Sequence, residues 1–245
     1  MCGRYMILTV PEAMRRLFAY LEQPNFPPRY NVAPTQPIPI VRLHEGKRQF
    51  ALVRWGLIPA WVKDPRGFSL LINARGESVN DKPAFRNAMK RRRCLVPADG
   101  FYEWKVEGGR RRPYAVRPKH RGPIAFAGLW ETWIGPNGEE METAAIVTTR
   151  ASRDIAFIHE RMPVIVPPDA FDLWLDCGRV DAETAAALIA PPPEGSLDAY
   201  EISDAVNSHT NDGLALLEPR GPEPEPGAAI KQSKKKTDER QSSLF

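Results

Sequence analysis

The distribution of proline is the feature that most constrains how this chain can fold. The 245 residues include 25 prolines, and most of them fall between short apolar runs. Because proline lacks a backbone N–H and has a fixed φ, it interrupts helices and is confined to the edges of sheets. The sequence therefore favours many short strands and loops over long helices.

The order of the apolar segments predicts an α+β fold, in which one compact, β-rich, barrel-like domain of mostly antiparallel short strands carries a few short helices. The first helix is expected to start with a capping box at Thr9–Glu12 and to bury Met14, Leu17, Phe18 and Leu21. The proline-rich segment 23–39 is expected to be irregular. The remaining elements follow from periodicity and turn residues. Strands are expected at 38–43, 49–55, 94–96, 114–117, 124–130, 144–149, 163–166 and 199–203, and helices at 11–22, 83–91, 168–175 and 181–189.

Composition and charge narrow the class of protein. No apolar run approaches the ~18 residues of a membrane-spanning helix, and no secretory signal is evident, so no membrane partner is expected. Three cysteines without CxxC spacing argue against a zinc site or a disulfide framework and fit a reducing cytoplasm. A net charge of +4 permits nucleic acid as a partner without requiring it. We expect a cytoplasmic monomer without a metal or cofactor.

A change of composition divides the chain into a domain at 1–218 and a tail at 219–245. The tail begins with alternating proline and glutamate and continues with polar and charged residues, which is typical of a disordered segment. Its last five residues are Gln-Ser-Ser-Leu-Phe. Two large apolar side chains in a polar tail indicate a short binding motif, and the alternative is a sequence without function.

The segment Met1-Cys2-Gly3-Arg4 indicates a reactive group. If Met1 is removed, Cys2 carries an α-amine and a thiol on adjacent carbons. Such an aminothiol attacks an aldehyde twice, because the amine forms an imine and the thiol then closes a five-membered thiazolidine. Both groups are usable near neutrality, since an α-amine has a pKa of about 7.7–8.0 and a thiol of about 8.5. Taken alone, this segment also fits a cysteine without function.

Two further segments combine polar groups with rigid neighbours. Asn73, Arg75 and Glu77 alternate and would project to one face of an extended segment. Glu103 lies among aromatic residues, where loss of water would make it a proton carrier near neutral pH. Each has a structural alternative, because Asn73 and Arg75 can satisfy buried backbone groups and Glu103 can pair with an arginine.

A third segment places His159, one of four histidines, close to Arg161 and just before a proline. A hydrogen-bonded structural histidine is the alternative here. For nucleic acid, basic runs at 90–93, 110–112 and 117–121 accompany aromatic side chains, which is the composition of a single-strand binder. The alternative is a solvated charged face. The aromatic candidates are Trp55, Trp61, Phe101, Tyr102 and Trp104.

Six motifs together resemble the SOS-response-associated peptidase family. The resemblance runs from Cys2 to about Asn207, which is nearly the whole predicted domain. The motifs are Met-Cys-Gly-Arg at 1–4, Asn-Val-Ala-Pro-Thr at 31–35, Trp-Gly-Leu-Ile-Pro at 55–59, Asn-Ala-Arg at 73–75, Pro-Ala-Asp-Gly-Phe-Tyr-Glu-Trp at 97–104 and His-Glu-Arg-Met-Pro at 159–163.

This resemblance implies a β-rich domain that binds single-stranded DNA and joins Cys2 covalently, as a thiazolidine, to the aldehyde of an abasic site. It implies that Asn73 holds the Cys2 amine or the sugar, that Glu103 shuttles protons, and that His159 helps to open the sugar and to reverse the crosslink. It also implies a group of residues that contact DNA or organise the pocket. That group consists of Arg4, Asn31, Trp55, Arg75 and Arg161.

Two features depart from the family pattern. Gly76 stands where alanine or serine usually follows Asn-Ala-Arg, and the tail lies outside the shared domain. The tail tip is similar to a peptide that binds the bacterial sliding clamp, with Gln241, Leu244 and Phe245 as its contacts, although the usual second-position leucine is missing. The expected partners are therefore single-stranded DNA with abasic sites and the clamp, in association with the nucleoid.

Three rival functions remain open at this level. The family name suggests a cysteine peptidase, which would remove its own Met1 with Cys2 as the nucleophile. An abasic-site lyase would use the amine alone, because an imine at C1′ can lead to β-elimination. A reader of modified bases would bind DNA without any covalent step.

Overall fold

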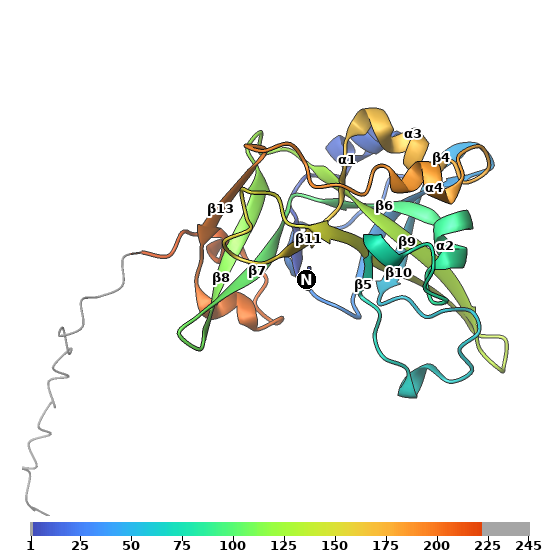
Figure 1. Cartoon of the computed structure of the whole chain (residues 1–245), viewed down its shortest axis with the longest axis horizontal. Coiled ribbons are helices and arrows are strands. Elements are labelled where there is room, and N and C mark those ends of the chain that lie inside the picture. The colour runs from blue at the N-terminus through green and yellow to red at the C-terminus, as the bar shows by residue number, and fades with distance from the viewer. Residues whose placement is uncertain (1, 222–245) are drawn as a thin grey trace, which may run out of the picture.

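The computed structural model describes residues 2–221, which form two sheets and several short helices (Figure 1). The α-helices are α1 (Pro11–Phe18), α2 (Arg86–Arg91), α3 (Phe171–Leu175) and α4 (Ala182–Ala186). The 3-10 helices are η1 (Pro65–Gly67), η2 (Gly76–Ser78), η3 (Pro168–Ala170), η4 (Asp204–Asn207) and η5 (Leu214–Leu217). No helix within residues 2–221 has the length and apolar character needed to cross a membrane.

The larger sheet contains a closed barrel. Its strands are β3 (Pro37–His44), β4 (Lys47–Trp55), β5 (Asn73–Arg75), β6 (Arg93–Ala98), β9 (Ile124–Ile134), β10 (Glu140–Arg150), β11 (Arg161–Pro163) and β12 (Ile165–Val166). Strands β10, β4, β3, β6 and β9 follow one another by hydrogen bonding, and the pairing of β9 with β10 closes the ring. Most pairs are antiparallel, and β10 runs parallel to β4 and β5. The predicted β-rich, barrel-like α+β class is confirmed.

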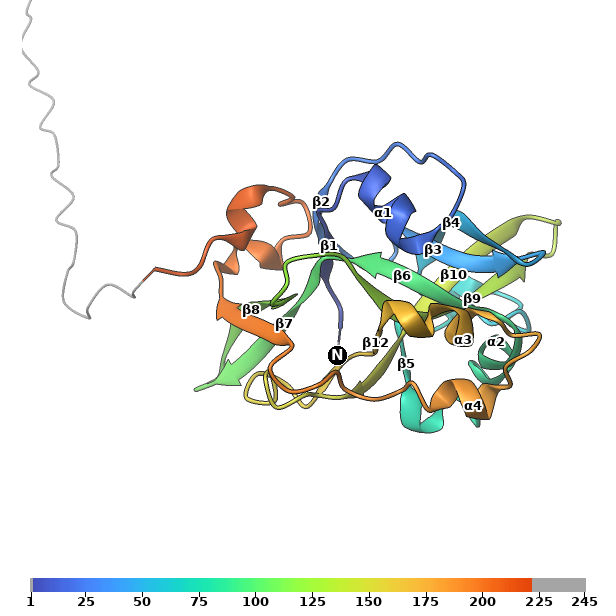
Figure 2. The same cartoon turned by 90° about the horizontal axis from the view of Figure 1, so that it is seen from above.

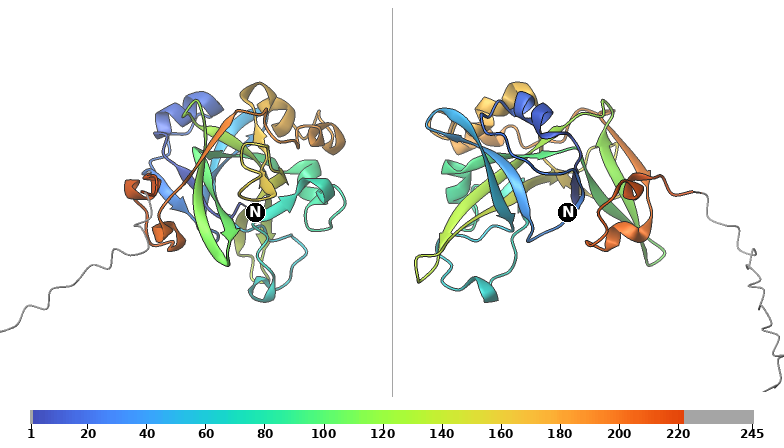
Figure 3. Two further views of the ribbon diagram at one scale, coloured as in Figure 1. Left: turned by 60° about the vertical axis from the view of Figure 1, so that its left-hand side comes forward. Right: turned by 180° about the vertical axis from the view of Figure 1, so that it is seen from behind.

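The smaller sheet lies beside the barrel. Its order is β13 (Leu197–Glu201), β8 (Arg110–Pro118), β7 (Gly100–Glu107), β1 (Tyr5–Ile7) and β2 (Arg29–Val32). Figure 2 shows this sheet on one side of the molecule and the barrel on the other, with the N-terminal end of the described chain between them. The segments η4 and η5 lie against the smaller sheet, near β8 and β2 (Figure 3). The two sheets therefore bring the first residues to the centre of the molecule.

Several sequence-based boundaries were wrong. Helix α1 ends at Phe18 because Ala19 adopts a left-handed conformation with φ 54° and donates its N–H to Arg15, and Leu21 is exposed. The capping box is absent, since the Thr9 hydroxyl donates to the Asp99 carboxylate. Strand β2 interrupts the segment that was expected to be irregular. These errors arise because contacts with distant residues override local patterns.

Arg93 joins the barrel to the helices around it. This fully buried side chain donates to the backbone carbonyls of Met89, Trp174, Asp176 and Val180, and burial lowers its pKa from the usual value. The guanidinium is thereby surrounded by four carbonyl acceptors, one of which, that of Asp176, also accepts the backbone N–H of Val180. These acceptors compensate its positive charge.

Replacing Arg93 with methionine should lower the free energy of unfolding by about 3 kcal/mol, because buried carbonyls would lose their donors. Urea denaturation measures this change. The matched control is Arg179→Met, since the Arg179 side chain is 90% exposed and its loss should change stability by less than about 0.5 kcal/mol. Equal stability of the two variants would contradict the anchoring role of Arg93.

Candidate functional site

Strand β1 carries Cys2 into the centre of the molecule. Tyr5 pairs with Val32 of β2 on one side and with Phe101 of β7 on the other, and Tyr102 donates its backbone N–H to the Arg4 carbonyl at 3.0 Å. Because β1 lies between two strands, the residues that precede it have a fixed path. That path ends between the β7–β8 hairpin and strands β5 and β11 (Figure 1).

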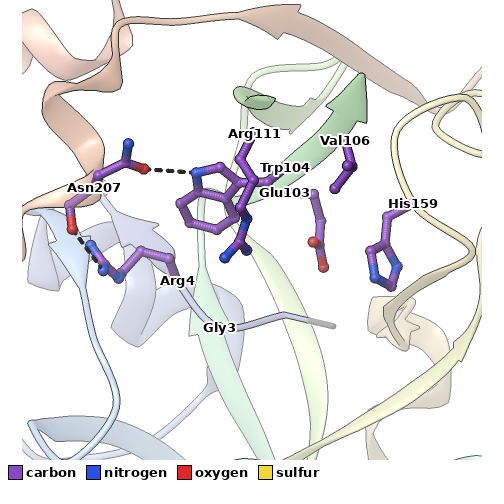
Figure 4. A pocket seen from close by; sticks show the side chains of 8 residues that line it. All are labelled: Gly3, Arg4, Glu103, Trp104, Val106, Arg111, His159 and Asn207. Carbon is purple, nitrogen blue, oxygen red and sulfur yellow. Dashed lines mark hydrogen bonds between the residues drawn. The ribbon is translucent and has the colours of Figure 1, made fainter. Parts of the chain in front are cut away.

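A cavity of about 590 Å³ opens at this point, and its size falls in the range of small-molecule sites. Figure 4 shows the Glu103 and His159 side chains next to each other and pointing the same way, with the ribbon of the first residues running past Gly3 and ending beneath them. The remaining wall comes from the β7–β8 hairpin and from the loop at residues 204–211, which begins with η4 and is called the late loop below. The cavity is lined by Gly3, Arg4, Glu103, Trp104, Val106, Arg111, His159 and Asn207.

The Cys2 thiol lies buried behind this cavity. Its side chain is fully buried, and its sulfur lies 4.0 Å from the Arg4 carbonyl oxygen. Burial raises the pKa of the thiol above its usual range, and the nearby Glu103 carboxylate raises it further. The thiol is therefore protonated at neutral pH, and any reaction at sulfur needs a group that removes its proton.

Asn73 fixes the backbone at Cys2. Its Nδ2 donates to the Cys2 carbonyl oxygen at 2.8 Å, and strand β5 holds it in register with Ile146 of the barrel. The Asn73 Oδ1 is buried, and within residues 2–221 it has no hydrogen-bond partner. A buried acceptor without a hydrogen-bond donor lowers the stability of the fold. The Asn73 Oδ1 can therefore accept a hydrogen bond from a donor at the N-terminal end of the chain.

The His159 ring has a defined orientation. Its Nδ1 accepts the backbone N–H of Arg161 at 2.9 Å, so the neutral imidazole carries its proton on Nε2. Glu103, only 2% exposed, lies on β7 across from Tyr114 of β8. A carboxylate and an imidazole N–H thus face one cavity beside a primary thiol, which is a constellation suited to proton transfer.

Arg161 holds a carboxylate close to the cavity. Its guanidinium donates to both oxygens of Glu77, at 3.0 and 2.8 Å, and to the Thr148 carbonyl at 2.9 Å. The hydrogen bond from Arg161 lowers the pKa of Glu77, so Glu77 is ionised at neutral pH. Arg75 is exposed and adds a second positive charge near the same carboxylate.

Arg4 and Asn31 tie the N-terminus to the late loop. Arg4 donates to the Asn31 Oδ1 and to the Val206 carbonyl, each at 2.8 Å. The Asn31 Nδ2 donates to the carbonyls of Val206, Ser208 and Asn211. Asn31 is only 1% exposed, so its predicted contact with DNA is replaced by a structural role. Arg4 lines the cavity while it holds the loop.

The predicted role of Trp55 in binding DNA is also replaced by a structural one. Its side chain is fully buried, its indole N–H donates to the Ile72 carbonyl at 3.0 Å, and its ring meets Tyr5 edge-on at 5.3 Å. No face of the ring is open to a base. Phe101 and Tyr102 are likewise buried, whereas Trp61 is 59% exposed.

Two polar residues of the cavity, Arg111 and Asn207, were not singled out as site residues from the sequence. The Trp104 indole N–H donates to the Asn207 Oδ1 at 2.8 Å, and the Arg111 guanidinium lies 5.6 Å from the centre of the Trp104 ring. The sequence did mark both positions, because Asn207 is the last residue of the family resemblance and Arg111 lies in a basic run. Trp104 brings these two residues to one cavity, and the β7–β8 hairpin and the late loop that carry them are far apart in sequence.

The described residues contain no group of three or more His, Cys, Asp or Glu side chains arranged to hold a metal ion. The positions expected to contact the clamp, Gln241, Leu244 and Phe245, lie outside the described residues.

Comparison with known proteins identifies the class to which this fold and site belong. The model of the SOS response associated peptidase (SRAP) family matches residues 1–209, so the chain belongs to this family. Among its relatives is the abasic site processing protein YoqW of Bacillus subtilis, which is 35% identical over 222 residues, covering 89% of this chain and 99% of YoqW. The chicken abasic site processing protein HMCES is 32% identical, covering 89% of this chain and 78% of HMCES.

A solved structure has the same fold. A protein from Bacteroides thetaiotaomicron superposes with a TM-score of 0.80 at 25% sequence identity, covering 89% of this chain and all of that protein. The match of the family model confirms the predicted family.

Proposed function

We propose that this protein processes abasic sites in single-stranded DNA by forming a covalent thiazolidine crosslink through Cys2. The relatives named above are abasic site processing proteins. The observation that carries the proposal is the position of Cys2. Its carbonyl accepts a hydrogen bond from Asn73, its thiol lies near enough to Glu103 for that carboxylate to raise the thiol pKa, and the next residue, Gly3, lines the cavity together with Glu103 and His159 (Figure 4). Removal of Met1 would give Cys2 the free α-amine that the reaction requires.

The first step opens the sugar and captures its aldehyde. The Nε2–H of His159 hydrogen-bonds to the ring oxygen of the abasic deoxyribose. The ring oxygen takes a proton from water and the C1′ hydroxyl gives its proton to water, so the bond from C1′ to the ring oxygen breaks and the C1′ aldehyde is freed. The Cys2 amine then attacks C1′ and forms a carbinolamine, while the Asn73 Oδ1 accepts an N–H bond from the amine and orients its lone pair. Glu103 in its acid form protonates the departing hydroxyl, so water leaves and a C1′ iminium remains.

The second step closes the thiazolidine. The Cys2 thiol is protonated, because burial and the Glu103 carboxylate both raise its pKa. Glu103, left as a carboxylate by the first step, removes the thiol proton as sulfur adds to C1′. The nitrogen keeps one hydrogen, and the overall reaction joins aldehyde, amine and thiol with loss of one water. Sulfur addition removes the imine through which β-elimination would break the strand.

The environment of the thiol favours this reaction over a thiol-only peptidase. Nucleophilic cysteines of peptidases have a lowered pKa that stabilises the thiolate, whereas the pKa of Cys2 is raised. Blocking the α-amine chemically while leaving the thiol intact distinguishes thiazolidine formation from thiol-only peptide cleavage. A thiazolidine cannot form without the amine, whereas peptide cleavage by the thiol would continue.

A matched pair of oligonucleotides tests the proposed function. One carries a natural abasic site and the other carries a site without the aldehyde, with the same sequence and charge. We expect a crosslink that survives denaturation only with the aldehyde, since both reaction steps occur at C1′. Equal yields with the two oligonucleotides would reject the proposal.

The tail is proposed to bring the domain to replication sites in the bacterial cytoplasm, because Gln241, Leu244 and Phe245 are similar to a clamp-binding peptide. Binding of the tail to the clamp would raise the effective concentration of the attached domain there. Deleting residues 241–245 should weaken binding to the sliding clamp by at least about tenfold and leave the crosslinking rate unchanged. Fluorescence anisotropy measures the first quantity and denaturing gels the second.

The matched control for this deletion replaces Ser242 and Ser243 with alanine and keeps Leu244 and Phe245. Clamp affinity should stay near the wild-type value in this control. Unchanged affinity after the deletion would remove the clamp from the list of partners.

A further inference from the structure

Glu77 lies where two cations converge beside the cavity. Its carboxylate accepts two hydrogen bonds from Arg161, at 3.0 and 2.8 Å, and Arg75 adds its charge. The Glu77 side chain is 58% exposed, while that of Arg161 is only 13% exposed. A mostly buried guanidinium thus presents its donors outward to an accessible anion.

Arg161 does not depend on Glu77 for its position. Strand β11 holds its backbone opposite Arg150 of β10, and its NH2 group also donates to the carbonyl and the hydroxyl of Thr148, at 2.9 and 3.2 Å. These contacts involve the barrel and remain if the carboxylate is removed. The ion pair with Glu77 is therefore an addition to a guanidinium that is already fixed.

A phosphate would make the same contacts as this carboxylate. Guanidinium groups bind carboxylates and phosphates with the same two-pronged geometry. The site also lies next to the reacting centre, because the Arg161 N–H donates to the His159 Nδ1. A backbone phosphate bound here would hold a sugar close to His159.

We propose that Glu77 occupies a DNA phosphate subsite formed by Arg161 and Arg75, with Thr148 holding the Arg161 guanidinium in place, and that DNA displaces the Glu77 carboxylate on binding. This inference rests on the proposed function. Glu77 thereby weakens binding to any single strand, and productive binding needs the additional contacts that an abasic site makes with Cys2 and Asn73. Glu77 therefore reduces the fraction of the protein that is bound to undamaged single-stranded DNA.

The test is the affinity of Glu77→Gln for an oligo-dT strand without an abasic site, so that no covalent step contributes. The amide keeps the size of the side chain and removes its charge. Affinity should rise about three- to tenfold, because a negative charge within a few ångströms of a bound phosphate is lost. The matched control is Glu12→Gln, which removes the same charge from α1, where Glu12 pairs with Arg15 and Arg16.

Each outcome decides the question. Tighter binding by Glu77→Gln alone supports the inference. Unchanged or weaker binding by Glu77→Gln overturns the inference and makes Glu77 a support for Arg161. An equal rise in affinity in Glu77→Gln and Glu12→Gln also overturns it, because the effect would then come from the net charge of the protein. Glu77→Asp, which keeps the charge, should bind oligo-dT no more tightly than the wild type and shows whether altered packing alone raises affinity. If neither the wild-type protein nor Glu77→Gln binds oligo-dT, this inference is overturned, whereas the proposed function is decided separately by the crosslink yield with the matched pair of abasic oligonucleotides.

Discussion

Replacing Cys2 with alanine is expected to abolish the stable crosslink to an abasic site. Alanine keeps the α-amine after removal of Met1 but cannot close the five-membered ring, so the reaction stops at an imine that water reverses. The loss of the stable crosslink should be complete, so the adduct yield on a denaturing gel should equal the background. Because the imine still forms, treatment with borohydride should trap it and strand cleavage by β-elimination should increase.

The matched control for this variant is Cys177→Ala. It also removes one thiol, from a partly exposed position outside the cavity, and it should crosslink at the wild-type rate. A Cys2→Ala protein that forms stable adducts at the wild-type yield would contradict the assignment of Cys2 as the reacting residue.

Replacing Glu103 with glutamine is expected to slow crosslink formation by about 10²-fold, the lower end of the range for removing a general acid–base group. The amide fits the same space but cannot carry a proton between the carbinolamine, water and the thiol. Single-turnover kinetics with excess protein measure the rate. Binding to an oligonucleotide without the aldehyde should be close to that of the wild type.

The control is Glu131→Gln, because Glu131 is also a buried acid, at 5% exposed, but pairs with Arg92 on the barrel, 3.1 Å away. This variant should retain the wild-type rate. A fall in melting temperature that matches the loss of rate in Glu103→Gln would make Glu103 a structural residue.

The sequence predicted the barrel because its strands are marked locally. The apolar run 124–130 follows Gly122-Pro123, and the turn at Pro136-Asn137-Gly138 separates it from the run 144–149. Both runs lie within longer strands that pair with each other. The strand at Asn73–Arg75 is different, since its partner β10 lies about seventy residues further on and runs parallel to it. No local pattern specifies such a pairing.

The errors at the site have the same origin. Trp55 sits in a segment rich in glycine and proline, which is typical of an exposed loop, but the carbonyl of Ile72 satisfies its indole and allows burial. Asn31 becomes a structural residue only because the late loop supplies three carbonyl acceptors. Residue type and neighbouring residues singled out Glu103 and His159, which line the cavity, and Asn73, which bonds to the Cys2 carbonyl. Distant partners decided which other polar and aromatic residues face the cavity.

The most direct test of the central claim is intact-mass analysis of the full-length protein before and after incubation with single-stranded DNA that carries one abasic site. We predict a protein that lacks Met1, followed by an adduct whose mass equals protein plus DNA minus one water and whose attachment maps to Cys2. A protein that lacks Met1 and forms no adduct, or an adduct attached at any other residue, would contradict the account.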